Sequence, residues 1–187
     1  MYKILFILLH KFPKRIGSYL RKLSLILRGM KIGRGTNIPK IKTIWPHQIQ
    51  IGNNCQLEDY LFLKFDGIYK PGPAIIIGNN CFIGQNCEFN IRKGIEIGNF
   101  ALIGSGTKFI DHDHGFTKGI LIKEQQGIEQ NIIIEDDVWI GCNSIILKGV
   151  RIGKGAVIAA GSVVNSNYIP SNEIWGGIPA KKISERK

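Results

Sequence analysis

A period of six residues constrains this chain more than any other feature of its sequence. Over one uninterrupted stretch an aliphatic residue returns at every sixth position: Ile134, Ile140, Ile146, Ile152, Ile158 and Val164. This spacing matches neither the period of about 3.6 residues of an α-helix nor the period of two of a β-strand. It therefore indicates an internal repeat rather than a series of ordinary helices or strands.

A second position of the repeat, four residues after each aliphatic, holds a small or β-branched residue. Its occupants are Thr36, Cys55, Cys81, Cys87, Ala101, Thr107, Val138, Ser144, Val150, Ala156 and Ser162. Three of the four cysteines share this position, so we interpret them as packing residues rather than as ligands or nucleophiles. The sequence has no CxxC pair, and neither a zinc knuckle nor a redox dithiol is indicated.

Each unit of six reads as a short strand followed by a turn. Glycine and asparagine make such turns at low cost, as in Gly52-Asn53-Asn54 and Gly78-Asn79-Asn80. A short strand cannot bury its aliphatic residue alone, whereas stacked coils can. The repeat therefore predicts an all-β solenoid with ladders of Ile and Val along a narrow core, and an apolar content of 44% supplies that core.

The N-terminal segment, residues 1–30, has a helical period instead. One face carries Ile16, Tyr19, Leu20, Leu23, Ile26 and Leu27, and the other carries Lys14, Ser18, Arg21, Lys22 and Arg28, with Leu25 as the exception. Gly29 is the predicted stop, and Pro13 is expected to separate this helix from the apolar run before it. The apolar face either packs on the rest of the protein or meets a membrane surface, and the sequence leaves both open.

The excess of positive charge lies at the same end of the chain. The net charge is +11, the first acidic residue is Glu58, and residues 1–57 hold 11 Lys and Arg, so the remainder is neutral. A neutral body argues against nucleic acid, whereas an anionic membrane or a lipid-linked anionic substrate fits a basic amphipathic segment. The longest early apolar run, Ile4 to Leu9, is too short to span a bilayer or to form a signal-peptide core. We therefore expect a cytoplasmic protein with peripheral contact at the membrane through residues 1–30.

The repeat is interrupted by a loop at about residues 111–131. This loop opens with Asp111-His112-Asp113-His114 and holds two of the four histidines. Loops on a rigid scaffold commonly carry function, and histidine titrates near neutrality, as a general base must. The alternative is that the histidines only hydrogen-bond within a turn; the two aspartates either orient an imidazole or cap the turn.

The C-terminal repeats resemble those of the hexapeptide-repeat acyltransferases. The segments that carry the resemblance are Asp137-Val138-Trp139-Ile140-Gly141, the run from Ile146 to Ile158, Ala160-Gly161-Ser162-Val163-Val164 and Gly177-Ile178-Pro179-Ala180-Lys181. They look most like galactoside and maltose acetyltransferases and the O-acetyltransferases of surface-polysaccharide gene clusters. The resemblance implies a left-handed parallel β-helix over residues 31–169, with three hexapeptides per coil, and a C-terminal tail over residues 170–187.

The resemblance also implies a site. His112 matches the catalytic histidine, and Asn90, His114 and Asp111 are the candidates for binding the acceptor. The contacts of acetyl-CoA fall on Trp139, Cys142, Ala160, Asn165, Ser166 and Lys181, with a backbone amide at Cys142 facing the oxyanion. Asn165-Ser166 replaces a Thr-Lys pair of better-known members, and Ser184 replaces a basic residue, so Lys182, Arg186 or Lys187 would have to compensate. Other readings are a turn asparagine for Asn90, packing for Trp139 and a nucleophile for Cys142.

The expected function is acetyl-CoA-dependent O-acetylation of a sugar hydroxyl in surface-polysaccharide biosynthesis, by direct transfer with a histidine base. The alternatives are N-acetylation of an amino nucleotide sugar, O-acetylation of serine, and a non-catalytic β-helical scaffold. Some related proteins are zinc enzymes that need three imidazoles, but His10 and His47 lie far from the loop, so no metal is expected. The resemblance implies a homotrimer with each site between two chains.

Overall fold

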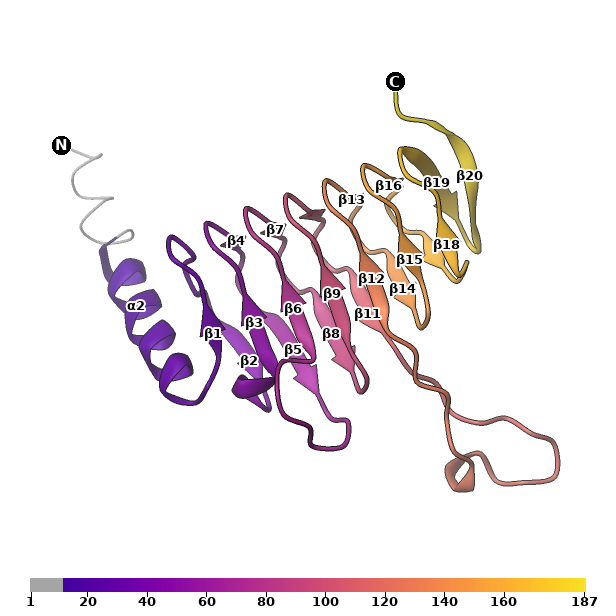
Figure 1. Ribbon diagram of the computed structural model, residues 1–187, viewed down its shortest axis with the longest axis horizontal. Coiled ribbons are helices and arrows are strands. Elements are labelled where there is room, and N and C mark those ends of the chain that lie inside the picture. The colour runs from indigo at the N-terminus through magenta and orange to yellow at the C-terminus, as the bar shows by residue number, and fades with distance from the viewer. Residues whose placement is uncertain (1–11) are drawn as a thin grey trace.

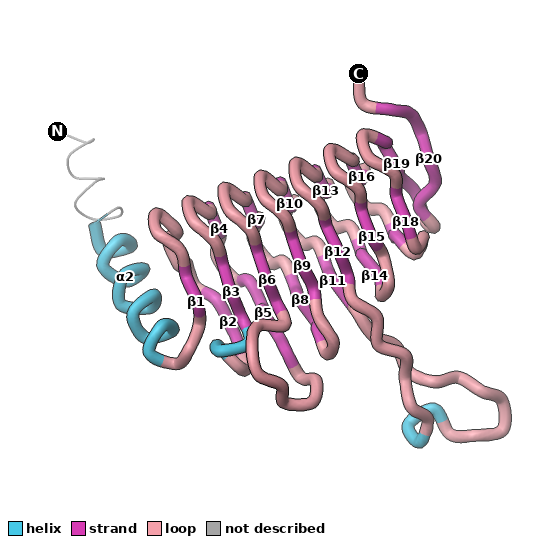
Figure 2. The backbone as a smooth tube through the Cα atoms, viewed as in Figure 1, coloured by secondary structure: helices cyan, strands magenta, loops and turns pink. Residues whose placement is uncertain are grey.

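The structure, a computed structural model, describes residues 12–187, with one α-helix followed by a solenoid of short strands (Figure 1). The solenoid is a left-handed parallel β-helix, as the resemblance implied. Three parallel sheets form the sides of a triangular prism, and successive strands along the chain pass from one sheet to the next. Figure 2 shows that two longer loops leave this regular winding on the same side of the molecule.

Neighbouring strands in each sheet are mostly three apart in their order along the chain. Sheet A contains β1 (Lys31–Ile32), β3 (Ile49–Ile51), β6 (Ile75–Ile77), β9 (Ile95–Ile97), β12 (Ile132–Ile134), β15 (Arg151–Ile152) and β18 (Tyr168–Ile169). Sheet B contains β2 (Ile41–Thr43), β5 (Leu61–Phe65), β8 (Glu88–Ile91), β11 (Lys108–Ile110), β14 (Ile145–Leu147) and β17 (Val163–Val164). Sheet C contains β4 (Gln56–Leu57), β7 (Phe82–Ile83), β10 (Leu102–Ile103), β13 (Trp139–Ile140), β16 (Val157–Ile158), β19 (Glu173–Gly177) and β20 (Ala180–Glu185).

The aliphatic ladders predicted from the period of six form the core. The six residues of the uninterrupted series are all buried, and they fall on sheets A, C and B in turn. Strand register places each of them beside its counterpart in the next coil, as in the pairing of Ile134 with Ile152 and of Ile140 with Ile158. In sheet B the ladder includes two aromatic rings, Phe89 and Phe109, whose centroids lie 4.8 Å apart.

The small residues of the second position are buried at the corners of the prism, as predicted. Cys55, Cys81 and Cys87 are among them, and each Sγ donates a hydrogen bond to a glycine carbonyl of the next coil. Burial raises the pKa of the Cys87 thiol to about 11. All three cysteines are buried packing residues, whereas Cys142 is exposed.

The turn between sheets A and C repeats a ladder of side-chain amides. The backbone N–H of Asn53 donates to Oδ1 of Asn79, Asn79 donates to Asn99, and Asn99 donates to Asp136. Glycine is required beside this ladder, because a Cβ on Gly52 would lie 2.4 Å from a backbone oxygen of the next coil. The turns thus explain why Gly and Asn recur in the sequence.

Both ends of the solenoid are covered by elements outside the repeat. Helix α2 (Phe12–Leu27) lies across the N-terminal end, and Gly29, with φ of +91°, follows its last turn. The C-terminal tail is a hairpin, since β20 runs antiparallel to β19 at the edge of sheet C. No helix within residues 12–187 is long and apolar enough to cross a membrane. The apolar run before Pro13 lies outside the described residues.

Candidate active site

The loop that carries the histidines begins where β11 ends. Along this stretch the chain alternates between core and surface: Phe109 is buried, Ile110 lies on the outer face, and Asp111 is fully buried again. His112 follows at the surface, with 13% of its side chain exposed. The chain re-enters the solenoid at β12, so His112 stands at the base of the long loop.

Asp111 connects the histidine to the neighbouring coil. Its carboxylate accepts hydrogen bonds from three consecutive backbone amides, those of Arg92, Lys93 and Gly94, at 2.9, 2.7 and 2.8 Å. Oδ1 also lies 3.0 Å from Nδ1 of His112. Because this oxygen is an acceptor, it favours the proton on Nδ1 and leaves Nε2 with a free lone pair. An aspartate that fixes the ring of a base in this way is a recurring catalytic arrangement.

This position changes the role expected for Asp111. A side chain with no exposed surface and four hydrogen-bonded neighbours does not contact an acceptor substrate directly. The geometry instead supports both alternatives left open for it, the orienting of an imidazole and the capping of a turn. The turn that it caps, however, belongs to the preceding coil.

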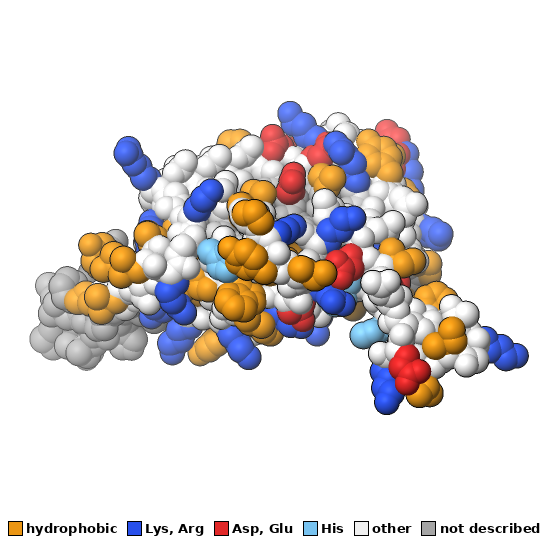
Figure 3. All heavy atoms as spheres, turned by 60° about the horizontal axis from the view of Figure 1, so that its bottom comes forward, with side chains coloured by type: hydrophobic (Ala, Val, Ile, Leu, Met, Phe, Trp, Pro, Cys, Tyr) orange, Lys and Arg blue, Asp and Glu red, His pale blue; other side chains and the backbone are white. Residues whose placement is uncertain are grey.

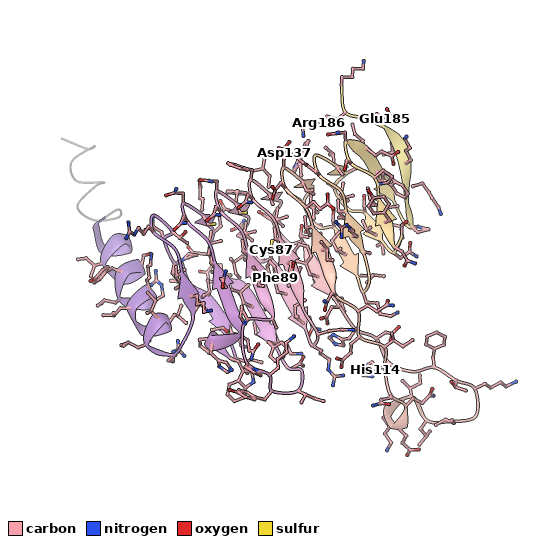
Figure 4. The ribbon with its side chains drawn as sticks, viewed as in Figure 1. Cys87, Phe89, His114, Asp137, Glu185 and Arg186 are labelled. Carbon is pink, nitrogen blue, oxygen red and sulfur yellow. The ribbon has the colours of Figure 1, made fainter. Side chains whose placement is uncertain are left out.

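The base of the loop is closed by polar contacts. His112 forms an antiparallel bridge with Glu129, and Asp113 accepts a hydrogen bond from the Ile128 amide at 2.9 Å. Lys148 of the next coil lies 2.5 Å from Asp113 and, together with that amide, lowers the pKa of its carboxyl. His114 is exposed where the loop leaves the solenoid, and in Figure 4 it lies at the lower edge of the prism.

Asn90 lies on the outer face of sheet B, one coil before the histidine. Its strand pairs with β11 so that Asn90 stands beside Ile110. The Oδ1 atom accepts a hydrogen bond from Lys64 at 3.0 Å, and Lys64 also pairs with Asp66 at 2.6 Å. Sequence reasoning missed Lys64, because its place beside Asn90 depends on the length of an irregular coil that no motif marks.

The candidates for CoA contact fall at three places in the chain. Trp139 is exposed on sheet C, and Cys142 and Ala160 occupy successive turns at the corner between sheets C and B. The close stacking of these turns is shown by Gly161, whose amide donates to the carbonyl of Cys142 at 2.8 Å. Cys142 and Ala160 therefore share one edge of the prism, and Trp139 lies on the adjoining face of sheet C.

The remaining candidates lie elsewhere. Asn165 and Ser166 follow β17 at the opposite edge of sheet B, the edge on which His112 stands two coils earlier. Lys181 is exposed on β20. Within one chain the width of sheet B separates His112 from the corner of Cys142, because Cys142 precedes β14 whereas His112 follows β11, its neighbour in register.

A groove of about 510 Å³ runs along the outer face of sheet C beside Trp139. Its lining is largely apolar, and the C-terminal strand forms one wall; the residues are Phe100, Leu102, Asp137, Val138, Trp139, Val157, Ile174 and 184–187. Figure 4 shows Asp137, Glu185 and Arg186 together at the upper edge, away from His114. Sequence reasoning missed this groove, because the tail that closes it lies outside the repeat.

Two of the basic residues considered for phosphate contact already have partners. Arg186 lies 2.7 Å from Asp137, and Lys182 lies 2.6 Å from Glu173 and 2.7 Å from Glu185. These pairs raise the pKa of Lys182 and lower that of Glu173. Exposed pairs of this kind contribute little to stability, so a bound phosphate can replace them.

Residues 12–187 contain no group of three or more His, Cys, Asp and Glu side chains that could hold a metal ion. His112 and His114 are successive donors on one loop, and His112 is engaged by Asp111.

Comparisons with known proteins identify the same repeat and the same fold. The family model of the bacterial transferase hexapeptide (six repeats) matches residues 131–166, and that of the hexapeptide repeat of succinyl-transferase matches residues 74–107. The matched stretches carry hexapeptide repeats of bacterial transferases, which this chain resembles in sequence and in fold. In hexapeptide-repeat proteins the period of six is the signature of the fold.

Three similar proteins illustrate the range of the family. A variant of AntD, an N-acyltransferase from Bacillus cereus solved with dTDP-4-amino-4,6-dideoxyglucose and coenzyme A, superposes with a TM-score of 0.77 at 26% identity, covering 89% of each chain. A hexapeptide-repeat acetyltransferase from Vibrio cholerae O1 biovar eltor, complexed with acetyl coenzyme A, gives a TM-score of 0.64 at 26% identity over 90% of this chain and 78% of that one. The 2,3,4,5-tetrahydropyridine-2,6-dicarboxylate N-succinyltransferase of Wolbachia sp. subsp. Brugia malayi (strain TRS) is 36% identical over 96 residues, 48% of this chain. That match spans about a third, 34%, of the Wolbachia protein.

Proposed function

We propose that this protein transfers an acetyl group from acetyl-CoA to a hydroxyl of a sugar in surface-glycan assembly, with His112 as the general base. The observation that carries the proposal is the Asp111–His112 pair at the base of the loop, with its Nδ1–Oδ1 distance of 3.0 Å. A hydroxyl is a poor nucleophile until its proton is removed, so a fixed imidazole at the acceptor is what this reaction requires. The CoA complexes of the similar structures support the donor.

The reaction proceeds by direct transfer. Nε2 of His112 takes the hydroxyl proton as the oxygen bonds to the thioester carbonyl carbon, and the negative charge moves to the carbonyl oxygen. A backbone amide at Cys142 donates to that oxyanion. Collapse of the intermediate breaks the carbon–sulfur bond, and the proton on Nε2 passes to the departing CoA sulfur. The products are the acetyl ester and free CoA, and His112 returns to its neutral form.

This mechanism requires a second copy of the chain. His112 and the corner of Cys142 and Ala160 lie at opposite edges of sheet B, so one chain does not bring the base and the thioester together. Packing three prisms with parallel axes places the histidine edge of one copy against the CoA edge of the next. We therefore propose a homotrimer in which each site is shared by two chains.

A second candidate is N-acylation of a nucleotide-linked amino sugar. The similarity to AntD over 89% of both chains favours it, because that enzyme was solved with such a sugar. The two candidates differ in the bond that is formed. Mild alkali hydrolyses an O-acetyl ester and leaves an N-acetyl amide intact.

The experiment is an assay of CoA release with acetyl-CoA and a panel of glycans, nucleotide sugars, amino nucleotide sugars and serine, followed by mass spectrometry before and after alkali. We expect an acetylated sugar whose added mass disappears in alkali. An alkali-stable product establishes the N-acyl candidate instead. Binding of CoA without turnover on any acceptor would establish a binding protein or scaffold.

A further inference from the structure

Helix α2 is attached to the solenoid by its polar face. Arg21 donates to the carbonyl of Ile38 at 3.2 Å, and Lys22 donates to the carbonyls of Gly33 and Thr36 at 2.8 and 3.0 Å. Ser18 accepts a hydrogen bond from the Ile38 amide at 2.9 Å. All of these partners belong to the first coil, whose outer edge has no preceding coil to pair with. The helix therefore supplies the hydrogen bonds that an edge strand otherwise lacks.

The apolar face of α2 consequently points to solvent. The six residues that the helical period placed on one face are all exposed: Ile16, Tyr19, Leu20, Leu23, Ile26 and Leu27, with exposed fractions from 43% to 78%. Leu25, which does not belong to that face, is the one leucine of the helix that is buried. Of the two alternatives that the sequence left open, packing of this face on the rest of the protein does not occur within a single chain.

Basic side chains surround this face. A hollow of about 510 Å³ lies between α2 and β2, and its lining includes three cations, Arg21, Arg28 and Lys42, but no acidic residue. None of the three takes part in an ion pair within the described part of the chain. Figure 3 shows hydrophobic and basic side chains at the end of the molecule where α2 lies, with no acidic side chain in view there.

We propose that α2 docks the enzyme on an anionic phospholipid bilayer. The six exposed residues enter the interface between headgroups and acyl chains, as amphipathic helices of this kind do. The cationic hollow between α2 and β2 receives a lipid phosphate.

Charge decides between a bilayer and a second copy of the chain. Association of two copies through α2 would bring together two N-terminal regions, residues 1–57 of each copy, which carry 11 basic residues and no acidic one. Like charges of that density repel, whereas an anionic lipid surface attracts each of them. A side-by-side trimer also leaves α2 free, because the helix covers the end of the prism and not one of its sides.

The test is co-sedimentation of the full chain with vesicles of phosphatidylcholine, alone or mixed with phosphatidylglycerol, at low and high salt. We expect pelleting with the mixed vesicles at low salt, less at high salt, and little with phosphatidylcholine alone. The triple variant Leu20→Gln, Leu23→Gln, Leu27→Gln keeps helix-forming residues and should lower the partition coefficient about a hundredfold or more. Arg28→Gln with Lys42→Gln should weaken only the binding that depends on anionic lipid.

Matched controls use exposed residues far from α2. Tyr168→Gln removes an exposed ring at the opposite end of the solenoid, and Lys118→Gln with Lys154→Gln removes two charges; both should pellet like the wild type. Equal pelleting of the triple variant and the wild type would overturn the proposal, and so would binding that is indifferent to lipid charge. A smaller assembly of the triple variant in light scattering would show that the face joins copies of this chain instead. Because binding is measured without turnover, the result is independent of the reaction proposed above.

Discussion

At the scale of single residues, Asp111 and His112 combine two tasks in one place. Asp111 holds the turn at Arg92, Lys93 and Gly94 and positions the imidazole with the same carboxylate. The orientation of the imidazole is thus tied to the packing of two coils. The sequence predicted His112 from its place at the loop, but it did not reveal the three amides, because they lie 17 to 19 residues earlier in another turn.

Replacing His112 by alanine should lower kcat by about 10²- to 10⁴-fold, the usual contribution of a general base, and leave CoA affinity nearly unchanged. His114→Ala, an exposed neighbour on the same loop, serves as the control and should have a much smaller effect. Steady-state kinetics and isothermal titration with CoA measure the two quantities. Equal losses from both variants would show that the wrong histidine was assigned.

Asp111→Asn should lower both stability and activity. The side chain of the asparagine keeps one acceptor oxygen but turns its NH₂ group towards backbone N–H groups, which are also donors. At least one hydrogen bond to a charged acceptor is therefore lost. A bond of that kind contributes about 1.5–3 kcal/mol to the free energy of unfolding. Chemical denaturation and kcat of the same variant test the double role; a fall in kcat without any loss of stability would mean that Asp111 only orients the ring.

Cys87 should make the protein less stable in alkali. The folded-state pKa of its thiol is about 11 against an ordinary value of 9.0, so above pH 9 the unfolded state releases this proton first. The thiol makes its full contribution to the free energy of unfolding below pH 9. This contribution is lost between pH 9 and 11, about 2 kcal/mol of it by pH 10.5. Between pH 8 and pH 10.5 the free energy of unfolding should therefore fall further for the wild type than for Cys87→Ala. Cys142→Ala, at an exposed thiol, should behave like the wild type.

At the scale of elements, periodicity predicted the strands well because each aliphatic of the repeat meets its own kind in the next coil. Ile140 and Ile158 show this, since they are three hexapeptides apart and adjacent in register. Periodicity could not orient α2. A helical period shows which side chains share a face but not what each face meets, and here the first coil offers unpaired backbone groups that the polar face satisfies.

The two faces of α2 should respond differently to the same substitution. Leu25 is 4% exposed at the end of the core, so Leu25→Ala should lower the free energy of unfolding by about 2–5 kcal/mol. Leu27, two residues later, is 78% exposed, and Leu27→Ala should change it by less than about 0.5 kcal/mol. Urea denaturation in the absence of lipid measures both. Similar losses would indicate that the helix packs through the other face in solution.

At the scale of the whole molecule, the candidate site is divided between two edges of the prism. The sequence supplied candidates for both edges, but a linear pattern does not show that sheet B separates His112 from Cys142 and Ala160. That separation appears only when the register of β11 and β14 is known. The proposed mechanism therefore needs an assembly of at least two copies of the chain.

Mixing two inactive variants should restore activity in the proposed trimer. His112→Ala removes the base, and Ala160→Trp fills the exposed corner at the CoA edge. In trimers assembled from equal amounts of both, each edge is intact in half of the chains, so about a quarter of the sites should be complete. Co-expression followed by activity measurement and light scattering tests this. No recovery in a mixed trimer, or full activity of a monomer, would place the whole site within one chain.

The number of coils fixes how far the reaction stands from α2. Four strands of sheet B, β2, β5, β8 and β11, lie between the helix and His112, and neighbouring strands are about 4.8 Å apart. Three such steps and the thickness of a helix, about 10 Å, add up to roughly 25 Å. If the protein docks on a bilayer through α2, the number of coils sets the distance between the bilayer surface and His112. Only an acceptor that places its sugar at that distance from the bilayer, such as a glycan several units long on a lipid carrier, would reach His112. Inserting one coil before β11 would therefore shift acetylation to a sugar unit farther from the lipid.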